Sequence, residues 1–224
     1  VRDFKIPQQN YDFVIHAATE ASVQLNQEDP SEMMSVIIDG TKKILELCNL
    51  CQTKRLLFTS SGAIYGSQPP EIKYVQEDYR GAPSPLETNS AYGEGKRIAE
   101  LMTMIESKKT SLEVSIARCY AFVGPHLPLN GAFAIGNFIG DGLAKKNIVV
   151  GGDGTPYRSY LYAADLVVWL LRLLTQGANG QAYNVGSSQD LTIKDLAGAI
   201  YRPSDDINNA NDDLDEQTKK SPSK

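Results

Sequence analysis

The fold of this chain is decided by the stretch KRLLFTSSGAIYG, residues 54–66, in which an apolar run leads into small polar residues. The run Leu56-Leu57-Phe58 is apolar at consecutive positions, as in a strand that is buried on both faces. Ser60-Ser61-Gly62 then favours a break, because glycine and small polar residues mark turns. We therefore predict a buried strand with hydroxyl side chains at its carboxyl end.

The same strand pattern recurs on both sides of this stretch. Buried strands are predicted at 11–19, 112–125 and 181–186, and apolar residues at steps of three and four predict amphipathic helices between them. Strands that alternate with helices imply a parallel, doubly wound sheet, whose ligands bind at the carboxyl ends of the strands. The other expected elements are helices around 37–48, 98–105, 133–144 and 163–174, a short strand at 147–150, and a last helix that begins with a capping box of Thr192 and Asp195.

Composition excludes several classes of function. The 224 residues are 42% hydrophobic and 22% charged, as in an ordinary soluble globular chain, and the net charge of −5 argues against a nucleic-acid surface. No apolar run approaches the length of a membrane span, and the first ten residues lack the apolar core of a secretory signal. We expect a cytoplasmic protein without nucleic-acid or membrane partners.

The cysteines do not indicate a metal centre. Cys48, Cys51 and Cys119 are an odd, sparse set, which suggests free thiols in a reducing compartment. Cys48 and Cys51 form a C-x-x-C that could be a redox or metal pair, or could face the core from a helix. His16 and His126 are too scattered to complete a zinc cluster, so we predict no metal site.

A candidate proton-transfer pair lies in SAYGEGKRIAE, residues 90–100, at the start of a predicted helix. Tyr92 and Lys96 are four residues apart and therefore share a helix face. A lysine cation one turn away favours tyrosinate and lowers the tyrosine pKa, which would make Tyr92 a base toward a substrate hydroxyl. The spacing alone favours the simpler interpretation, two exposed residues at a helix start.

The Tyr92–Lys96 pair is one part of a series of five motifs that follow one another along the chain. They are TSSGAIYG (59–66), YGEGK (92–96), RCYAFVGP (118–125), GDGTPYRSYLYAADL (152–166) and YNVG (183–186). Over roughly residues 1 to 200, the chain resembles the extended short-chain dehydrogenase/reductase family, in its NAD-dependent nucleotide-sugar epimerase/dehydratase branch. The resemblance implies a Rossmann-like doubly wound sheet that binds NAD, with NADP as the alternative, and a small C-terminal part that binds a nucleoside diphosphate sugar.

The resemblance also implies roles for single residues. Tyr92 would be the base, Lys96 would support it and contact the nicotinamide ribose, and Ser61 would hold the substrate oxygen. Arg158 would grip the nucleotide diphosphate, as its forked donors suit, with Asn137 a second candidate. From its own sequence context Arg158 could equally be a surface ion-pair partner. The expected cofactor-binding residues are Ala17, Ala18, Thr19, Ser60, Tyr92 and Lys96.

The chain departs from the family at its beginning. No G-x-x-G-x-x-G turn is present, so two β-α units of about 30 residues each are expected to be missing, and the Rossmann-like domain to be N-terminally truncated. We expect residues 1–125 to be a partial NAD(P)-binding domain and 126–202 to be the sugar-binding part mixed with the last Rossmann elements. Residues 203–224 have an acidic, apolar-poor composition and are expected to be a disordered tail.

A second departure from the family pattern reduces the number of reaction types that we expect. The family's dehydratases carry an Asp-Glu pair, and its decarboxylases a Glu, just after the Ser/Thr position, where this chain has Gly62 and Ala63. The resemblance therefore favours an epimerase or keto-sugar reductase. The alternative is a catalytically inactive family member that acts as a binding or interaction protein. By analogy alone, the resemblance also implies a homodimer through the helix that carries Tyr92.

Overall fold

The computed structural model of the chain describes residues 1–19, 22–131 and 133–201. The predicted tail at 203–224 lies outside the described residues. The described chain divides into two compact units. The first contains residues 1–124 and 160–188, and the second contains residues 125–159 together with the described residues from 189 onward.

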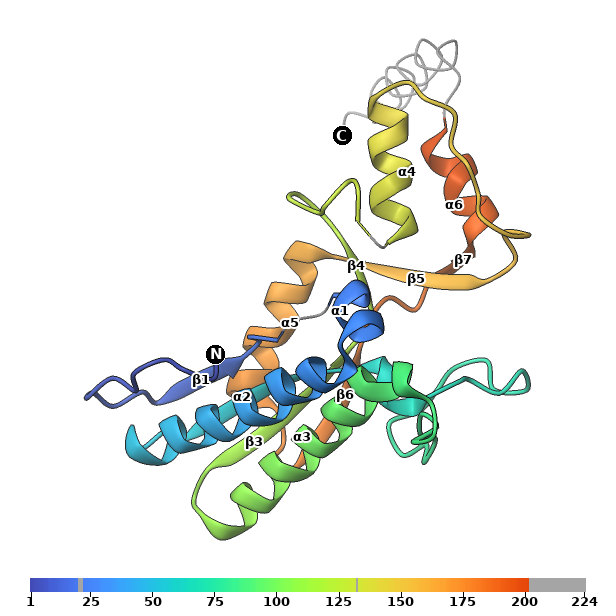
Figure 1. Cartoon of the computed structure of the whole chain (residues 1–224). Helices are drawn as coiled ribbons and strands as arrows, with labels where there is room; N and C mark the ends of the chain where they lie inside the picture. Colours follow the sequence, from blue (N-terminus) through green and yellow to red (C-terminus); the bar gives the residue numbers. More distant parts are fainter. Residues whose placement is uncertain (20–21, 132, 202–224) are drawn as a thin grey trace, which may run out of the picture. The chain divides into compact units, whose positions relative to one another are not determined.

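A parallel four-stranded sheet forms the centre of the first unit, in the order β1-β2-β3-β6 (Figure 1). All three neighbouring pairs are parallel, and Ser61 at the end of β2 is level with Cys119 at the end of β3. The carboxyl ends of the strands therefore meet at one edge. These strands confirm the predicted parallel α/β sheet, and they are β1 (Phe13–His16), β2 (Arg55–Ser61), β3 (Glu113–Cys119) and β6 (Gln181–Val185).

Helices cover both faces of this sheet because its strands are apolar at consecutive positions. Leu56 and Phe58 point into a core with residues of α2 (Pro30–Leu50), which lies beside α3 (Ala91–Lys109) (Figure 1). Leu57 points to the opposite face, where it packs in a second core with residues of α5 (Ala163–Gln176). The short α1 (Val23–Glu28), capped by Ser22, precedes α2.

The strand β2 ends as its sequence predicts. Ser61 is the last strand residue, and its hydroxyl caps a one-turn 3₁₀ helix, η1 (Gly62–Tyr65), by accepting the Ala63 N–H at 3.1 Å. A long irregular segment follows, interrupted at its end by the short η2 (Thr88–Ser90), from which α3 begins. This connection places the start of α3 next to the end of β2.

The second unit contains α4 (Ala134–Leu143), β7 (Asp190–Thr192) and α6 (Ile193–Ile200). The predicted capping box of α6 is present, since Thr192 and Asp195 exchange hydrogen bonds. Residues 157–159 of β5 (Tyr157–Tyr162) belong to this unit and pair antiparallel with β7. Residues 160–162 of the same strand belong to the first unit, where they pair parallel with β4 (Ala121–Val123).

The predicted strand at 147–150 is wrong. These residues form no strand, and Val149 is 77% exposed. The run is apolar and β-branched, but it pairs with no strand among the described residues, so local propensity has no hydrogen-bonding partner. None of the helices in the described ranges combines the length and apolar character that a membrane span needs.

We predict that Phe58→Ala lowers the free energy of unfolding by about 3–5 kcal/mol, because a fully buried ring would leave a cavity. Phe13→Ala is the matched control, since Phe13 is 51% exposed on the neighbouring strand and should cost less than about 1 kcal/mol. Urea unfolding of the two variants checks this. Equal losses would contradict the assignment of Phe58 to the core.

Candidate functional site

The carboxyl edge of the sheet gathers the predicted catalytic residues. Ser61 ends β2, Tyr92 and Lys96 occupy the first turns of α3, and Thr19 follows β1. Asn26 of α1 helps to seat the helix start, because its Oδ1 accepts the Tyr92 N–H at 2.9 Å. Three segments that are far apart in the sequence thus meet beside Tyr92 and Lys96.

Lys96 is a buried cation with defined partners. Its side chain is almost inaccessible, and Nζ donates to the Thr59 carbonyl at 2.8 Å and to Thr19 Oγ1 at 3.3 Å. The ammonium group also lies 4.9 Å from the centre of the Phe58 ring, a cation–π distance. Burial lowers the Lys96 pKa to about 8, although the nearby Cys119 and Glu100 partly oppose this. Lys96 is therefore held in place by defined partners, while burial makes its charged form less favourable than that of an exposed lysine.

Tyr92 and Ser61 form a hydroxyl pair beside this lysine. Burial raises the pKa of Tyr92, and a hydrogen bond with Ser61 only partly offsets the rise. Lys96 Nζ lies 6.0 Å from the centre of the Tyr92 ring. The expectation that Lys96 lowers the pKa of Tyr92 is therefore wrong for this structure, because desolvation of the phenol outweighs the favourable interactions.

Neutral polar groups surround the lysine. His16 Nε2 lies 3.1 Å from Thr41 Oγ1, and burial followed by the charge of Lys96 lowers the His16 pKa to about 4. His16 is therefore uncharged near neutral pH and adds no second positive charge. His16 Nδ1 and Ser60 Oγ are buried and have no hydrogen-bond partner among the described residues.

These groups fit one end of a dinucleotide. Thr19, Ser60, Tyr92 and Lys96 offer hydroxyl and ammonium groups at the strand ends, and Ser60 Oγ is an orphaned buried hydroxyl. Ala17 and Ala18 are exposed directly after β1, so their backbone is accessible to a ligand. This set suits the ribose and nicotinamide of NAD, whereas the sequence offers no glycine-rich turn for the pyrophosphate.

The predicted substrate-binding residues Asn137 and Arg158 belong to the second unit. Asn137 is half-buried on α4, and Arg158 is exposed on β5, where its Nη1 donates to the carbonyl of Tyr157. In the part of the chain that the structure describes, no ion pair involves Arg158. Its exposed guanidinium therefore keeps donors beyond the one that contacts Tyr157, and its role toward a diphosphate stays a prediction.

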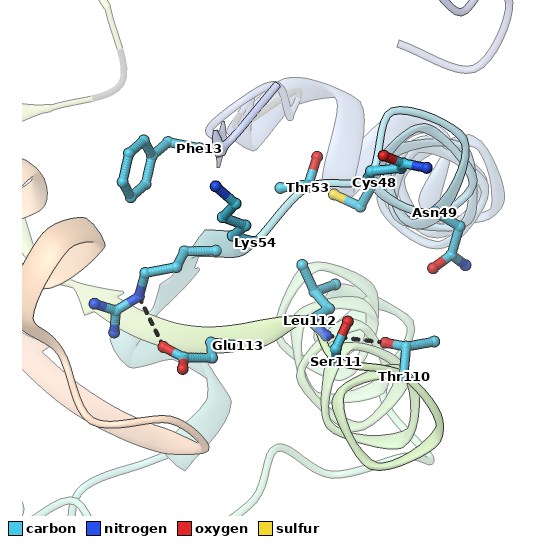
Figure 2. A pocket seen from close by; sticks show the side chains of 11 residues that line it. Phe13, Cys48, Asn49, Thr53, Lys54, Thr110, Ser111, Leu112 and Glu113 are labelled. Atoms are coloured by element: carbon cyan, nitrogen blue, oxygen red, sulfur yellow. Dashed lines mark hydrogen bonds and ion pairs between the residues drawn. The ribbon is translucent and has the colours of Figure 1, made fainter. Parts of the chain in front are cut away.

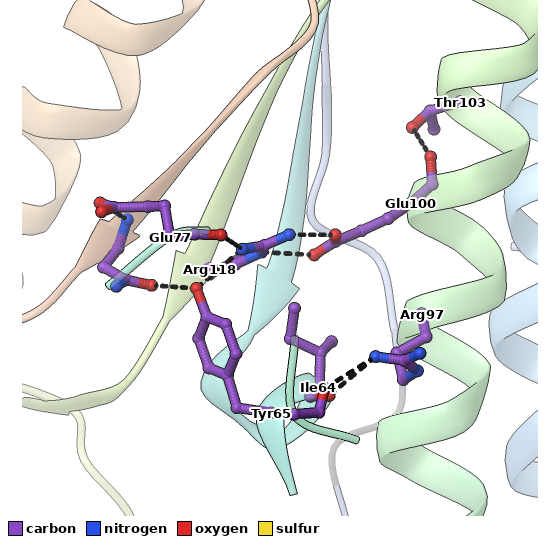
Figure 3. A network of polar contacts seen from close by, with 9 residues as sticks. Ile64, Tyr65, Glu77, Arg97, Glu100, Thr103 and Arg118 are labelled. Carbon is purple, nitrogen blue, oxygen red and sulfur yellow. Dashed lines mark hydrogen bonds and ion pairs between the residues drawn. The ribbon is translucent and has the colours of Figure 1, made fainter. Parts of the chain in front are cut away.

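A polar network that sequence reasoning missed joins β3, α3 and β6 to η1 and the segment after it (Figure 3). Arg118 of β3 makes a two-pronged ion pair with Glu100 of α3, at 3.1 and 2.9 Å, and donates to the Tyr65 hydroxyl at 2.7 Å. Tyr65 donates in turn to Asn184 of β6 at 2.9 Å. The available signal was Arg118 itself, a charged residue inside a buried strand pattern, where ions are normally paired.

This network also anchors the irregular segment after η1. Arg118 donates to the carbonyl of Glu77 at 2.8 Å, and the Asn184 N–H donates to the Glu77 carboxylate at 2.8 Å. Arg97 of α3 donates to the carbonyls of Ile64 and Gly81. The turn that contains Ser61 is thus tied to α3, β3 and β6.

A separate hollow of about 690 Å³ lies at the opposite, amino edge of the sheet (Figure 2). Lys54 and Arg55 line it, but Lys54 pairs with Asp12 and Arg55 pairs with Glu113. Cys48 also lines this hollow and is buried, and the described residues contain no group of three or more potential metal ligands. The hollow and the predicted catalytic residues are therefore at different ends of the strands.

The comparison with family models decides the family. The model described as the NAD dependent epimerase/dehydratase family matches residues 3–186. The chain belongs to this family. The residues that it matches include the whole edge described above, from Thr19 to Asn184.

Several curated proteins are relatives of this chain. It is similar to UDP-glucuronic acid decarboxylase 2 of Arabidopsis thaliana, with 32% identity over 95% of this chain and 46% of that protein. UDP-glucuronic acid decarboxylase 1 of Xenopus tropicalis is 31% identical over 84% of this chain and 44% of that protein. The chain thus spans about half the length of these relatives.

Solved structures show the same fold. The structure of the UDP-glucose 4-epimerase of Thermotoga maritima with UDP-glucose matches with a TM-score of 0.73 at 25% identity. The match covers 87% of this chain and 60% of the epimerase chain. A UDP-N-acetylglucosamine 4-epimerase of Methanobrevibacter ruminantium has a TM-score of 0.75 at 25% identity, with 84% and 58% covered. The fold class of this family member, a Rossmann-like parallel α/β sheet, is therefore confirmed.

We predict a pH-dependent stability that originates in Lys96. Its pKa is about 8 in the folded chain and ordinarily 10.5, so between these values the unfolded chain binds more protons and the folded chain gains stability as the pH rises. Relative to Lys96→Met, the free energy of unfolding of the unmodified chain should increase by up to about 3 kcal/mol from pH 8 to pH 10.5.

Denaturant titrations at several pH values measure this difference. Lys109→Met is the control for the loss of a lysine from the same helix, because Lys109 is exposed. A difference for Lys96→Met that does not change with pH would contradict the burial of a charged Lys96.

Proposed function

We propose that this chain supplies the catalytic centre of an NAD-dependent nucleotide-sugar epimerase or keto-sugar reductase. One observation carries the proposal: the hydrogen-bonded Ser61–Tyr92 hydroxyl pair lies beside the buried Lys96 at the carboxyl edge of a Rossmann-like sheet. Membership of the NAD-dependent epimerase/dehydratase family supports it. NADP remains the alternative cofactor.

In the proposed reaction, Tyr92 acts in its tyrosinate form and takes the proton of a sugar hydroxyl while Ser61 holds the same oxygen. NAD, when bound, would supply the hydride acceptor for the carbon that carries this hydroxyl. Ser61 is oriented for its task because its Oγ is already fixed by the Ala63 N–H and by Tyr92. Lys96, when protonated, would stabilise the tyrosinate from beside the Tyr92 ring and would contact a ribose hydroxyl of the bound cofactor. Water is largely kept from this lysine by burial, which strengthens its field.

The substrate in this proposal is a nucleoside diphosphate sugar. Arg158 and Asn137 would contact its diphosphate, and the accessible guanidinium of Arg158 matches the charge and geometry of a phosphate. The assignment of NAD to residues 1–125 and of the sugar nucleotide to residues 126–202 is part of the same proposal.

We infer the reaction type from the two residues that follow Ser61 in the sequence. Gly62 and Ala63 carry no acidic group there. Elimination of water needs a group that protonates the leaving oxygen, whereas epimerisation or reduction needs only one hydride and one proton. The decarboxylases that the chain resembles carry a glutamate at this place, and this chain has none. We therefore favour the latter two reactions both over dehydration and over the decarboxylation that names the curated relatives.

The central test is Tyr92→Phe, which removes the proton acceptor and keeps the ring. Turnover of UDP-glucose with NAD should fall by about 10²- to 10⁴-fold. Tyr74→Phe is the matched control, because Tyr74 is 52% exposed and lies outside the site, so its turnover should be unchanged. Intact turnover in Tyr92→Phe would reject Tyr92 as the base.

Calorimetric titration of the unmodified chain with NAD separates this proposal from the inactive alternative. The absence of a glycine-rich turn in the sequence favours the alternative, which predicts no measurable affinity for NAD. Our proposal predicts saturable binding, even where the affinity is lowered by the lack of that turn.

We also propose a homodimer through α3. Its outer surface exposes Ile98, Leu101 and Ile105, the second of them at 61%. A charge at Leu101 should weaken a contact at this surface, so Leu101→Glu should shift the sedimentation coefficient from dimer to monomer. Leu86→Glu, at a position that is 94% exposed outside α3, is the control and should leave the sedimentation unchanged. A monomeric unmodified chain would reject the dimer.

A further inference from the structure

Tyr120 is a large side chain that is held between two glycines beside Ser61. It follows β3 directly, and its N–H donates to the Val185 carbonyl at 3.0 Å. A Cβ atom added to Gly62 would lie 2.7 Å from Cε1 of the Tyr120 ring, and one added to Gly186 would lie 3.3 Å from the Tyr120 Cβ. The ring therefore rests on Gly62, and the base of the side chain rests on Gly186.

Gly62 is required by this contact and not by its backbone. Its φ lies outside the left-handed region that favours glycine, unlike that of Gly66, whose φ is 69°. Other residues could adopt the same backbone, but a side chain there would overlap the Tyr120 ring. The glycine and the tyrosine are therefore a matched pair, and a change in one alters the space available to the other.

The pair acts on Ser61 through the turn that Ser61 caps. Gly62 is the first residue of η1, and the Ser61 hydroxyl accepts the N–H of the next residue, Ala63. A ring that presses on Gly62 thus limits the movement of the turn and, with it, the position of Ser61 Oγ. The same hydroxyl is hydrogen-bonded to Tyr92, so the ring indirectly supports the proposed proton-transfer pair.

Tyr120 contributes shape and not an acid or a base. Burial, followed by its neighbours Tyr65 and Glu77, raises the Tyr120 pKa to about 12, so the phenol stays protonated near neutral pH. The carboxylates of the adjoining network are engaged elsewhere, Glu100 by Arg118 and Glu77 by the Asn184 N–H. The neutral Tyr120 ring thus occupies the space into which a side chain at position 62 would project.

We propose that Tyr120 positions Ser61 and restricts the reaction, because its ring holds the Ser61-capped turn in place and fills the space that an acidic side chain at position 62 would need. The site is then limited to the transfer of one hydride and one proton. This second part rests on the proposed function, whereas the packing of Tyr120 on Gly62 does not.

A double-mutant cycle on stability tests the packing without any need for turnover. Gly62→Ala should raise the unfolding equilibrium constant roughly tenfold in the unmodified chain, and less than about threefold in a Tyr120→Ala background. Gly198→Ala is the matched control, since an added Cβ meets nothing within 4 Å in helix α6 and should not destabilise. An equal cost of Gly62→Ala in both backgrounds would overturn the proposal.

Kinetics test the positioning of Ser61. With UDP-glucose and NAD, Tyr120→Ala should lower kcat by about ten- to a hundredfold with little change in KM, because a displaced Ser61 affects the chemical step. Tyr120→Phe keeps the ring and should stay within about threefold of the unmodified protein. An equal loss in Tyr120→Phe would show that the hydroxyl acts and would overturn the proposal. If the unmodified protein shows no turnover, the proposed function fails, and the stability cycle alone decides the packing.

Discussion

The parallel register of β2 and β3 is the constraint on which the site depends. It sets Ser61 level with Cys119, so that the turn after β2 and Tyr120 after β3 leave the sheet at the same height. The pairing of β3 with β6 adds Val185 to this level and positions Gly186 under Tyr120. Because parallel strands all end at one edge, hydroxyls, glycines and helix starts from distant segments converge there.

Burial at this edge of the sheet disfavours charged side chains, and Lys96 is nevertheless buried there. The ammonium group keeps a carbonyl, a hydroxyl and an aromatic ring as partners, but desolvation still lowers its pKa to about 8. The same desolvation keeps His16 neutral and Tyr92 protonated. Burying such groups is costly, which is why perturbed pKa values so often mark functional sites. The Arg118–Glu100 ion pair shows the other solution, in which two buried charges neutralise each other.

The proposed catalytic residues could be named from the sequence because each lies in a short local pattern. Ser61 ends an apolar run, and Tyr92 and Lys96 share one helix face, so the sequence places them at element ends without any tertiary information. The strand at 147–150 failed for the opposite reason, because a strand exists only if a partner accepts its hydrogen bonds, and local composition cannot supply one. The prediction that Tyr92 has a lowered pKa failed for a similar reason. The spacing of Tyr92 and Lys96 indicates a neighbouring charge, but it does not indicate that burial removes water from the phenol.

The sequence by itself determined the alternation of strands and helices and the family, and it named the three candidates for the proposed proton-transfer group. Only the tertiary structure decided that Arg118 pairs with Glu100, that Lys96 reaches the Thr59 carbonyl, and that Gly62 lies under the Tyr120 ring. These contacts join residues up to 58 positions apart, from Gly62 to Tyr120. Periodicity and turn chemistry act over a few residues, whereas close packing between distant segments depends on how the whole sheet brings them together.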